Sequence, residues 1–507
     1  MKIVRVFLCL LFPVMSYIRA NAQPALKERL DSFLNVMAAN DLFTGSILIA
    51  EHGRVIYTKS SGYWNEERKI PNSDTTPFQL ASMSKPFTAL AVLQLIQKGG
   101  LQLDTPVVRY LTDFPYTNVT VRHLLTHTGG LPAKFDQNYI ADHPQAVLTN
   151  KEDYALLVAS GAPLTSMPGE KWAYSNTGYM VLAQIIEKVS GRPFEIYMKK
   201  RVFEPAGMTH TYVRSAHMPN TPRYIIPVMY QREYHNVDSL DHTKIYTNYN
   251  LGDIHGPGNV ISTLADVFKF DNALSAGKLI SKELMEQAFT PVASNSGNAL
   301  HVNKGRSYGF GWNILQDSIG ADKIVFHDGH VIGIVTMIYK NLTKDQTILF
   351  YDNRESPAFF QKIGVVARLL NNEPVRNINL AKSLARLYGQ TLVTKGIDAA
   401  TTSFNELKDD TVHYYIDELE LNKLGYDLLG NKYPVANYKT LSLEVFKLNT
   451  LLFHSANSYD SYADALKANG KTEEAIRMYR KSTTLNPRDR EVKEKLAALE
   501  KAGNVGK

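Results

Sequence analysis

The sequence has a single cysteine, Cys9, among 507 residues. It lies in a short apolar stretch at the N-terminus, so the rest of the chain can form no disulfide and has no thiol nucleophile. Blocks of five or six like charges are also absent, although the formal net charge is +7. This absence argues against a charged tail that binds nucleic acid. Beyond the N-terminus no stretch has the roughly 20 apolar residues that a membrane-spanning helix needs. We therefore expect the hydrophobic core alone to stabilise the fold.

Residues 1–22 have the pattern of a secretory signal peptide. Lys2 and Arg5 precede an apolar run at 6–14, and an A-x-A-type cleavage site ends at Ala22. The alternative is a membrane anchor, but the apolar run is too short to span a bilayer. We expect an exported protein with a periplasmic or extracellular location.

Composition and length indicate a globular chain of two or three domains. Hydrophobic residues make up 44% and charged residues 21%, as in ordinary globular domains. Strand patterns end before 371–374, and helical periodicity follows. We therefore predict an α+β domain at 23–372 and a helical domain at 373–507.

Several elements of the first domain can be predicted from their periodicity. Apolar residues at helical spacing predict an amphipathic helix at 24–40. Two β-rich runs around His52-Gly53 predict a hairpin over 45–58. The other predictions are two strands over 324–339 joined near 329–333, a strand at 347–351, a helix ending near 370, and a glycine turn at 256–258 into a helix capped by Ser262 or Thr263.

The main chemical signal is Ser82-Met83-Ser84-Lys85, at the start of a predicted helix that ends at Gly99-Gly100. Positions i and i+3 share a helix face, so the Lys85 amine can reach the Ser82 hydroxyl. A serine hydroxyl is a weak nucleophile until a base accepts its proton, and burial lowers the pKa of a lysine enough to make it that base. Alone, the S-x-x-K pair is a weak signal, because a solvated surface pair explains most matches to it.

A second cluster, Tyr174-Ser175-Asn176, precedes a predicted helix at 180–189. In isolation, a core tyrosine and a helix cap would explain Tyr174 and Asn176 as well as a functional role would.

His123 and His127 are four residues apart and could bind a metal from one helix face. Leu124 stands where an H-E-x-x-H zinc site has its glutamate, and no third ligand is evident. We interpret both histidines as satisfied side chains at a helix end, and predict no metal and no cofactor.

Taken in order, these clusters resemble the serine β-lactamase-related family of class C β-lactamases, penicillin-binding DD-peptidases, esterases and D-aminopeptidases. The matching elements are Ser82-x-x-Lys85, Tyr174-Ser175-Asn176 and His327-Asp328-Gly329, which correspond to the family's S-x-x-K, Y-x-N and third triad. The resemblance covers about 26–370. It implies a β-lactamase/transpeptidase-like fold, in which an antiparallel sheet is flanked by helices and Ser82 lies at the junction with an all-helical lobe.

The resemblance also implies roles for the matching residues. Ser82 would attack an acyl carbonyl and form an acyl-enzyme, while Lys85 and Tyr174 would share the proton transfers. Asn176 would bind the substrate's amide, and the backbone N–H groups of Ser82 and His330 would form the oxyanion hole. Water would then release the acyl group.

The third triad departs from the lysine-threonine-glycine of the β-lactamases. His327, a predicted catalytic residue, replaces a permanently charged lysine with a side chain that is only partly charged near neutral pH. Asp328 would repel a substrate carboxylate. Gly329 and His330 complete the predicted substrate-binding set. Some DD-peptidases and esterases of the family carry H-x-G, so a D-amino-acid peptide, cell-wall peptide or ester is favoured over a β-lactam.

The C-terminal third contains a stretch, 457–487, that resembles a tetratricopeptide repeat. The matching positions are Ala463, Gly470, Ala475, Tyr479 and Pro487. Leu424-Gly425 and Ala436 fit an earlier imperfect copy, and 493–501 fits a polar capping helix. Such repeats offer a concave surface to a peptide or protein, but a buttress for the catalytic domain is an equal alternative.

Two other functions stay open for the whole chain. One is a class C-like β-lactamase. The other is a catalytically inactive scaffold that binds a peptide or protein through its helical repeats. Intact Ser82, Lys85 and Tyr174 argue against the scaffold, because an inactive copy need not keep all three.

Overall fold

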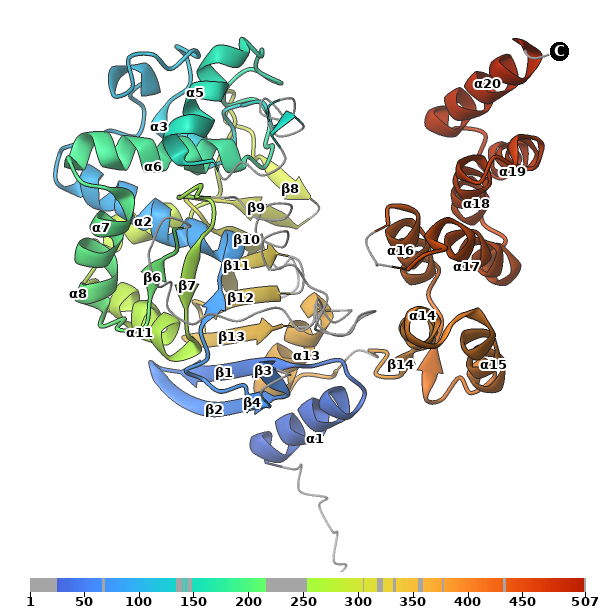
Figure 1. Ribbon diagram of the computed structural model, residues 1–507. Helices are drawn as coiled ribbons and strands as arrows, with labels where there is room; N and C mark the ends of the chain where they lie inside the picture. Colours follow the sequence, from blue (N-terminus) through green and yellow to red (C-terminus); the bar gives the residue numbers. More distant parts are fainter. Residues whose placement is uncertain are drawn as a thin grey trace, which may run out of the picture.

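The computed structural model describes residues 25–65, 69–133, 139, 142–143, 148–215, 253–303, 305–316, 322–331, 334–353, 359–375, 378–431 and 435–505. Within this part of the chain, a mixed α+β region is followed by a region of helices (Figure 1). This order confirms the predicted fold class. The predicted signal peptide at 1–22 lies outside the described residues. None of the described helices has both the length and the apolar composition of a membrane-spanning segment.

The mixed region is built around an eight-stranded antiparallel sheet (Figure 1). The hairpin predicted over 45–58 forms its β2–β1 edge, and the strands predicted from 324 to 351 are β11, β12 and β13. β-branched and aromatic residues dominate these segments, as suits a pleated, half-buried surface. In spatial order the strands are β2 (Arg54–Ser61), β1 (Gly45–Glu51), β13 (Gln346–Asp352), β12 (Ile334–Asn341), β11 (Lys323–Val331), β10 (Asn313–Gln316), β9 (Arg306–Tyr308) and β8 (His301–Asn303).

Both faces of the sheet are covered, each by its own apolar cluster. On one face, Phe326 and Met337 pack with α1 (Leu26–Ala39) and α13 (Phe359–Leu370), the two helices predicted at 24–40 and up to 370. On the other face, Val325 and Ile338 belong to a larger cluster with the helical lobe. Successive residues of a strand point to opposite faces, so these two clusters show which face each residue of β11 and β12 occupies.

The helical lobe packs on the second face of the sheet. Its central helix, α2 (Lys85–Gln97), has every residue from Lys85 to Leu95 buried, which is typical of a helix enclosed by other elements. The other helices of the lobe are α3 (Val121–Leu125), α5 (Asn150–Ser160), α6 (Asn176–Ser190), α7 (Phe194–Met198), α8 (Glu204–Ala206), α11 (Leu264–Ser275) and α12 (Lys282–Ala288), with the short turns η1 (Ala81–Ser84), η2 (Val107–Arg109) and η3 (Lys199–Phe203).

A small three-stranded sheet and a strand pair complete the mixed region. A three-stranded sheet has the order β5 (Phe78–Gln79), β7 (Val260–Ser262), β6 (Tyr212–Val213), and β3 (Tyr63–Asn65) pairs with β4 (Ile70–Pro71). The predicted turn at 256–258 leads through β7 into α11. Thr263 caps that helix by accepting a hydrogen bond from the Asp266 N–H, as predicted for one of the two candidate caps.

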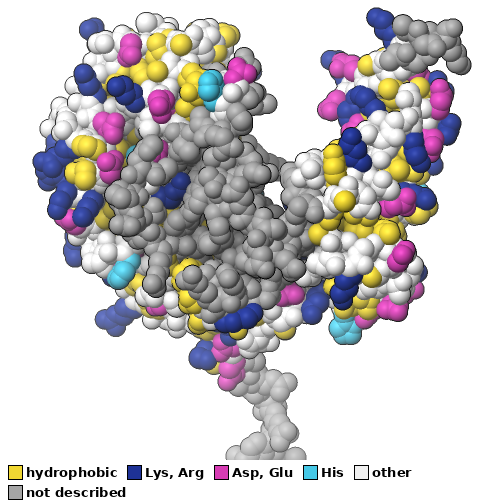
Figure 2. Space-filling view, in the orientation of Figure 1, with side chains coloured by type: hydrophobic (Ala, Val, Ile, Leu, Met, Phe, Trp, Pro, Cys, Tyr) yellow, Lys and Arg dark blue, Asp and Glu magenta, His cyan; other side chains and the backbone are white. Residues whose placement is uncertain are grey.

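The C-terminal region consists of stacked helices. Two apolar clusters hold them, one that includes Phe404 and Leu424 and one that includes Phe446 and Tyr479. On the face seen in Figure 2, basic and acidic side chains are interspersed over these helices. The helices are α14 (Leu384–Lys395), α15 (Ile397–Leu407), α16 (Glu418–Leu429), α17 (Tyr438–Phe453), α18 (Ala456–Ala468), α19 (Thr472–Leu485) and α20 (Arg490–Val505), with the short parallel pair β14 (Lys382–Ser383) and β15 (Tyr414–Tyr415).

The repeat pattern predicted from the sequence corresponds to helix pairs. The stretch 457–487 forms α18 and α19, the imperfect copy forms α16 and α17, and α20 covers the predicted capping segment. The small residues of the pattern have packing reasons. A Cβ at Gly425 would lie 2.5 Å from the Phe446 ring, so only glycine lets α16 and α17 approach this closely.

Candidate active site

Ser82 lies in a tight turn between the sheet and the helical lobe. The turn is η1, and α2 begins only at Lys85. Ala81 has a φ of 49°, an uncommon value for a residue with a side chain. The surrounding strands hold this conformation, because the Leu80 N–H donates to the Val260 carbonyl (2.8 Å) and the Thr336 hydroxyl donates to the Leu80 carbonyl (2.9 Å). The turn therefore fixes Ser82 against β7 and β12.

The amine of Lys85 is fully buried beside Ser82. Its Nζ lies 3.1 Å from Ser82 Oγ, 2.8 Å from Asn176 Oδ1 and 3.0 Å from the Pro257 carbonyl oxygen. Lys85 is 0% exposed. Burial lowers the pKa of this amine well below its usual value, although the Asp328 charge opposes the shift. A lysine with such a pKa can serve as a base near neutral pH.

Tyr174 comes to the same hydroxyl from the helical lobe. Its Oη lies 2.7 Å from Ser82 Oγ, and the Lys85 Nζ lies 4.7 Å from the centroid of its ring. As a whole residue Tyr174 is 42% exposed, although its hydroxyl end is desolvated. Desolvation of its hydroxyl end raises the pKa of Tyr174, so the phenol keeps its proton at neutral pH.

The five polar groups form one directed hydrogen-bond network that branches at Lys85. The oxygens of Asn176 and Pro257 that contact Lys85 can only accept, so two amine N–H groups satisfy them. A neutral amine then has its lone pair left for the Ser82 hydroxyl proton, while Tyr174 donates to Ser82 Oγ. This arrangement leads a proton from the serine to the lysine and keeps a second proton on the tyrosine.

The structure does not support the interpretation of Asn176 as a helix cap, because α6 is capped by the residue before it. Ser175 is the cap, because its Oγ accepts a hydrogen bond from the Gly178 N–H at 3.0 Å. Asn176 is instead the first residue of the helix, and its side-chain oxygen accepts from Lys85. The cap interpretation was therefore wrong for Asn176.

His123 and His127 differ from each other in their surroundings. His123 Nδ1 accepts from the Thr120 N–H in a capping box, as expected for a satisfied histidine. His127 is buried, and its Nδ1 accepts from the Ser175 N–H, but its Nε2 has no hydrogen-bond partner among the described residues. The prediction of a satisfied side chain was therefore wrong for His127. Its ring lies 4.5 Å from the Tyr174 ring, so it forms part of the wall behind the site.

No metal site accompanies this centre within the described ranges. No group of three or more His, Cys, Asp or Glu side chains there could hold a metal ion.

His327 lies on β11 and is neutral. Its Nδ1 donates to the Asp328 carbonyl (2.6 Å), so its Nε2 accepts from the Tyr308 hydroxyl (2.9 Å). The side chain is 2% exposed. Burial, reinforced by the Lys85 charge, lowers the pKa of His327 to about 3. The expectation of a partly charged histidine at neutral pH was therefore wrong.

Asp328 lies on the opposite face of the sheet from His327. β11 and β12 pair without a register shift, with His327 opposite Ile338 and Asp328 opposite Met337. Ile338 packs with the helical lobe and Met337 with α1 and α13. Strand alternation therefore directs the Asp328 side chain to the face away from Ser82. Its charge still acts on Lys85 and Tyr174, so the expected repulsion of a substrate carboxylate stays a prediction.

Gly329 and His330 form the end of β11 next to Ser82. A Cβ at Gly329 would lie 1.9 Å from the Leu80 carbonyl oxygen, so only glycine lets the strand backbone touch the serine turn. His330 is exposed. β10 pairs only as far as Phe326, which leaves this end of β11 beyond the pairing with β10.

Sequence reasoning missed three contributors, the Pro257 carbonyl, Tyr308 and the wall residue His127. Pro257 lies in the glycine turn that the sequence analysis predicted without a role. A Cβ at Gly256 would lie 2.2 Å from the Tyr179 carbonyl oxygen, so glycine is needed for the turn to reach Lys85. Only the Gly-Pro-Gly run could have indicated this contact, because every residue has a backbone carbonyl and the residue type does not show what that carbonyl contacts.

The chain is similar to known proteins in both of its regions. A family model described as Beta-lactamase matches residues 31–371, and a tetratricopeptide repeat model matches 456–499. A penicillin-binding protein of Bacillus subtilis (strain 168) is 32% identical over 468 residues, covering 89% of this chain and 98% of the relative. The Esterase EstB of Burkholderia gladioli is 33% identical over 200 residues, covering 36% of this chain and 50% of the esterase. The crystal structure of a penicillin binding protein from Bacillus halodurans superposes with a TM-score of 0.56 at 27% identity, covering 66% of this chain and 98% of that one.

Proposed function

The chain belongs to the beta-lactamase family of serine hydrolases, and we propose that it is an exported enzyme that hydrolyses a small amide or ester through an acyl-enzyme on Ser82. The proposal rests on one observation. The Ser82 hydroxyl lies between a buried amine at 3.1 Å and a phenol at 2.7 Å. The amine can accept its proton and the phenol can supply one to a leaving group.

In the acylation step, Ser82 Oγ attacks the substrate's carbonyl carbon. The new C–O bond forms as the hydroxyl proton passes to the neutral amine of Lys85, and the carbonyl π electrons move to its oxygen. The backbone N–H groups of Ser82 and His330 stabilise that oxyanion. The close approach of β11 to the serine turn at Gly329 supports this assignment of the oxyanion hole.

The tetrahedral intermediate then collapses. The bond to the leaving nitrogen or oxygen breaks, and the leaving atom takes the proton of Tyr174. The ammonium of Lys85, 4.7 Å from the centroid of that ring, stabilises the phenolate and returns a proton to it. In deacylation a water attacks the ester carbonyl, loses its proton to the same groups, and Ser82 leaves with a proton restored.

The substrate class follows from the charges around Ser82. Neutral His327 offers no permanent cation to a substrate carboxylate, so binding through a β-lactam carboxylate is disfavoured. The Nδ2 group of Asn176 is left to donate to an acyl-chain carbonyl, because Lys85 uses only Oδ1. One relative is named a penicillin-binding protein and another an esterase. We therefore favour a D-amino-acid peptide, a cell-wall peptide or an ester.

The proposal extends to the rest of the chain. Residues 1–22 direct export to a periplasmic or extracellular location, the catalytic domain spans 23–372, and 373–507 form the helical domain. The concave side of those repeats binds a peptide or protein, or else the repeats buttress the catalytic domain. The Bacillus subtilis relative covers 89% of this chain, so most of the helical region is shared with it.

Turnover by the wild-type protein and two variants tests the proposal. Substrates are p-nitrophenyl esters, D-alanyl dipeptides and a chromogenic cephalosporin. We expect hydrolysis of esters or D-peptides by the wild type, and none by Ser82→Ala. Ser296→Ala, at an exposed turn, is the matched control and should keep full activity. Turnover by Ser82→Ala would contradict the proposal. Turnover of the cephalosporin above all others would favour the class C-like β-lactamase. No turnover at all would favour the inactive scaffold.

A further inference from the structure

A pocket lies on the sheet face opposite Ser82. It is a cavity of about 460 Å³ between β10–β12 and α13, within the size range of small-molecule sites. Its floor is apolar and consists of Leu315, Phe326, Met337 and Ile363. Phe360 also lines it and is 54% exposed. A site of this shape suits an apolar chain.

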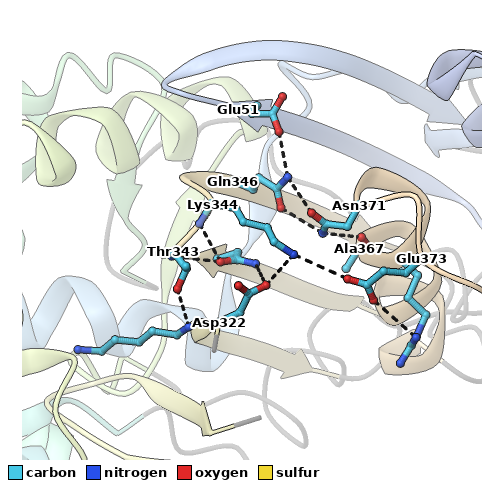
Figure 3. A network of polar contacts seen from close by, with 11 residues as sticks. Glu51, Asp322, Thr343, Lys344, Gln346, Ala367, Asn371 and Glu373 are labelled. Atoms are coloured by element: carbon cyan, nitrogen blue, oxygen red, sulfur yellow. Dashed lines mark hydrogen bonds and ion pairs between the residues drawn. The ribbon is translucent and has the colours of Figure 1, made fainter. Parts of the chain in front are cut away.

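One side of the pocket rim is already satisfied by internal contacts (Figure 3). Lys344 Nζ lies 2.7 Å from Asp322 Oδ2 and 3.7 Å from Glu373 Oε1. Arg368 lies 3.6 Å from the other oxygen of Glu373. The two acids of the lining are therefore paired, and they do not leave the pocket with an unopposed negative charge.

Arg306 is the exception in this lining. No ion pair within the described part of the chain involves its guanidinium, and its Nε is buried without a hydrogen-bond partner. A buried donor left unsatisfied is costly, and an oxyanion would satisfy it with a charge-assisted bond. The pocket thus combines an apolar floor with an arginine at its edge that makes no close ion pair among the described residues and has an unsatisfied Nε, and whose nearest opposite charge is that of Asp328.

Arg306 is also close to the catalytic wall. It lies on β9, two residues before Tyr308, whose hydroxyl holds His327 at 2.9 Å. Its charge also reaches Asp328 on β11. A ligand that fixed Arg306 would therefore contact the strand that positions His327.

We propose that this pocket binds an amphipathic carboxylate, with the carboxylate on Arg306 and the apolar chain along the floor formed by Leu315, Phe326, Met337 and Ile363. The ligand class is a medium-chain fatty acid or a molecule with the same two parts. This site is separate from Ser82, and it stands whether or not the proposed hydrolysis is correct.

Calorimetric titration of the full chain with decanoate tests the proposal. The Ser82→Ala protein is used so that turnover cannot contribute heat, and decyltrimethylammonium serves as the cationic match of equal chain length. Arg306→Gln removes the guanidinium. Gly364→Phe fills the pocket from α13, where no heavy atom of the described residues lies within 4 Å of an added Cβ, so the helix tolerates it. Arg192→Gln, at an exposed arginine of the helical lobe, is the matched control.

We expect one decanoate per chain and no saturable binding of decyltrimethylammonium. Arg306→Gln should weaken decanoate binding about tenfold to a hundredfold, Gly364→Phe should abolish it, and Arg192→Gln should leave it unchanged. Equal affinity for both amphiphiles, unchanged affinity in Arg306→Gln and Gly364→Phe, or no binding up to about 1 mM would each overturn the proposal.

Discussion

Lys85 directs its amine at the hydroxyl of Ser82 across 3.1 Å, from the first residue of α2. Its two other partners can only accept hydrogen bonds, so the neutral amine fits the site with its lone pair toward the serine. Burial favours that neutral form by lowering the pKa of Lys85. The burial that removes Lys85 from solvent therefore also makes it a base.

The pH dependence of hydrolysis should show this lowered pKa. Only neutral Lys85 accepts a proton, so kcat/KM for an uncharged ester should rise with pH through that pKa. The plateau should be reached well below the ordinary lysine value of 10.5. Because the pKa of Tyr174 is raised, deprotonation of the phenol should not end the plateau below about pH 10. Initial rates from about pH 5 to about pH 10 measure this, and a rise that reaches no plateau by about pH 10 would contradict it.

Tyr174→Phe should separate the two proton transfers. The variant keeps the ring over Lys85 but loses the hydroxyl that lies 2.7 Å from Ser82 Oγ. Loss of a general acid typically costs a hundredfold to about ten-thousandfold. A p-nitrophenolate leaving group needs no proton, so the loss should be much smaller for a p-nitrophenyl ester than for an anilide of the same acyl group. Equal losses for the two substrates would exclude Tyr174 as the proton donor.

Neutral His327 should leave substrate choice independent of pH around neutrality. With a pKa of about 3, the imidazole gains no charge as the pH falls through the ordinary histidine range. A peptide with a free C-terminal carboxylate should therefore show no gain over its methyl ester between about pH 8 and about pH 5.5. The ratio of their kcat/KM values, measured in parallel, checks this. A preference for the carboxylate that grows with acidity would show that His327 becomes protonated.

Gly329→Ala should damage both stability and catalysis. The added Cβ would lie 1.9 Å from the Leu80 carbonyl oxygen and 2.6 Å from Thr336 Oγ1, so β11 must move away from the serine turn. We expect a loss of about 1–3 kcal/mol in the free energy of unfolding and a fall of more than about tenfold in kcat/KM.

Gly364→Ala is the control for this substitution. No described atom lies within 4 Å of the added Cβ, so the free energy of unfolding of this variant should be unchanged or up to about 1 kcal/mol higher. Urea unfolding of both proteins gives the comparison, and a fully active and stable Gly329→Ala protein would refute the packing argument.

The sequence predicted local contacts well and distant ones only through the resemblance. The approach of Lys85 to Ser82 follows from helix spacing, and the strands around His327 follow from their β-branched residues. The contact between Tyr174 and the Ser82 hydroxyl could be predicted only from the resemblance to a known family, because no periodicity relates the two segments. The buried state of His327 depends on Tyr308 from another strand, and so its pKa could not be read from residue type.

Two side-chain placements were missed for different reasons. Strand alternation alone would have placed the Asp328 side chain on the opposite face from His327, so that information was present in the sequence. His127 is different, because its burial beside Tyr174 and Tyr308 depends on how separate segments meet. The strained φ of Ala81 likewise depends on the strands that hold its turn, since alanine has no preference for that conformation.

Intact-mass spectrometry with peptide mapping, after brief exposure to a fluorophosphonate, a penicillin and an activated ester, tests the central claim most directly. The account predicts one adduct per chain on Ser82 from at least one of these acylating or phosphonylating agents, and none in the Ser82→Ala protein. An adduct that maps to another residue, or that persists in Ser82→Ala, would contradict it.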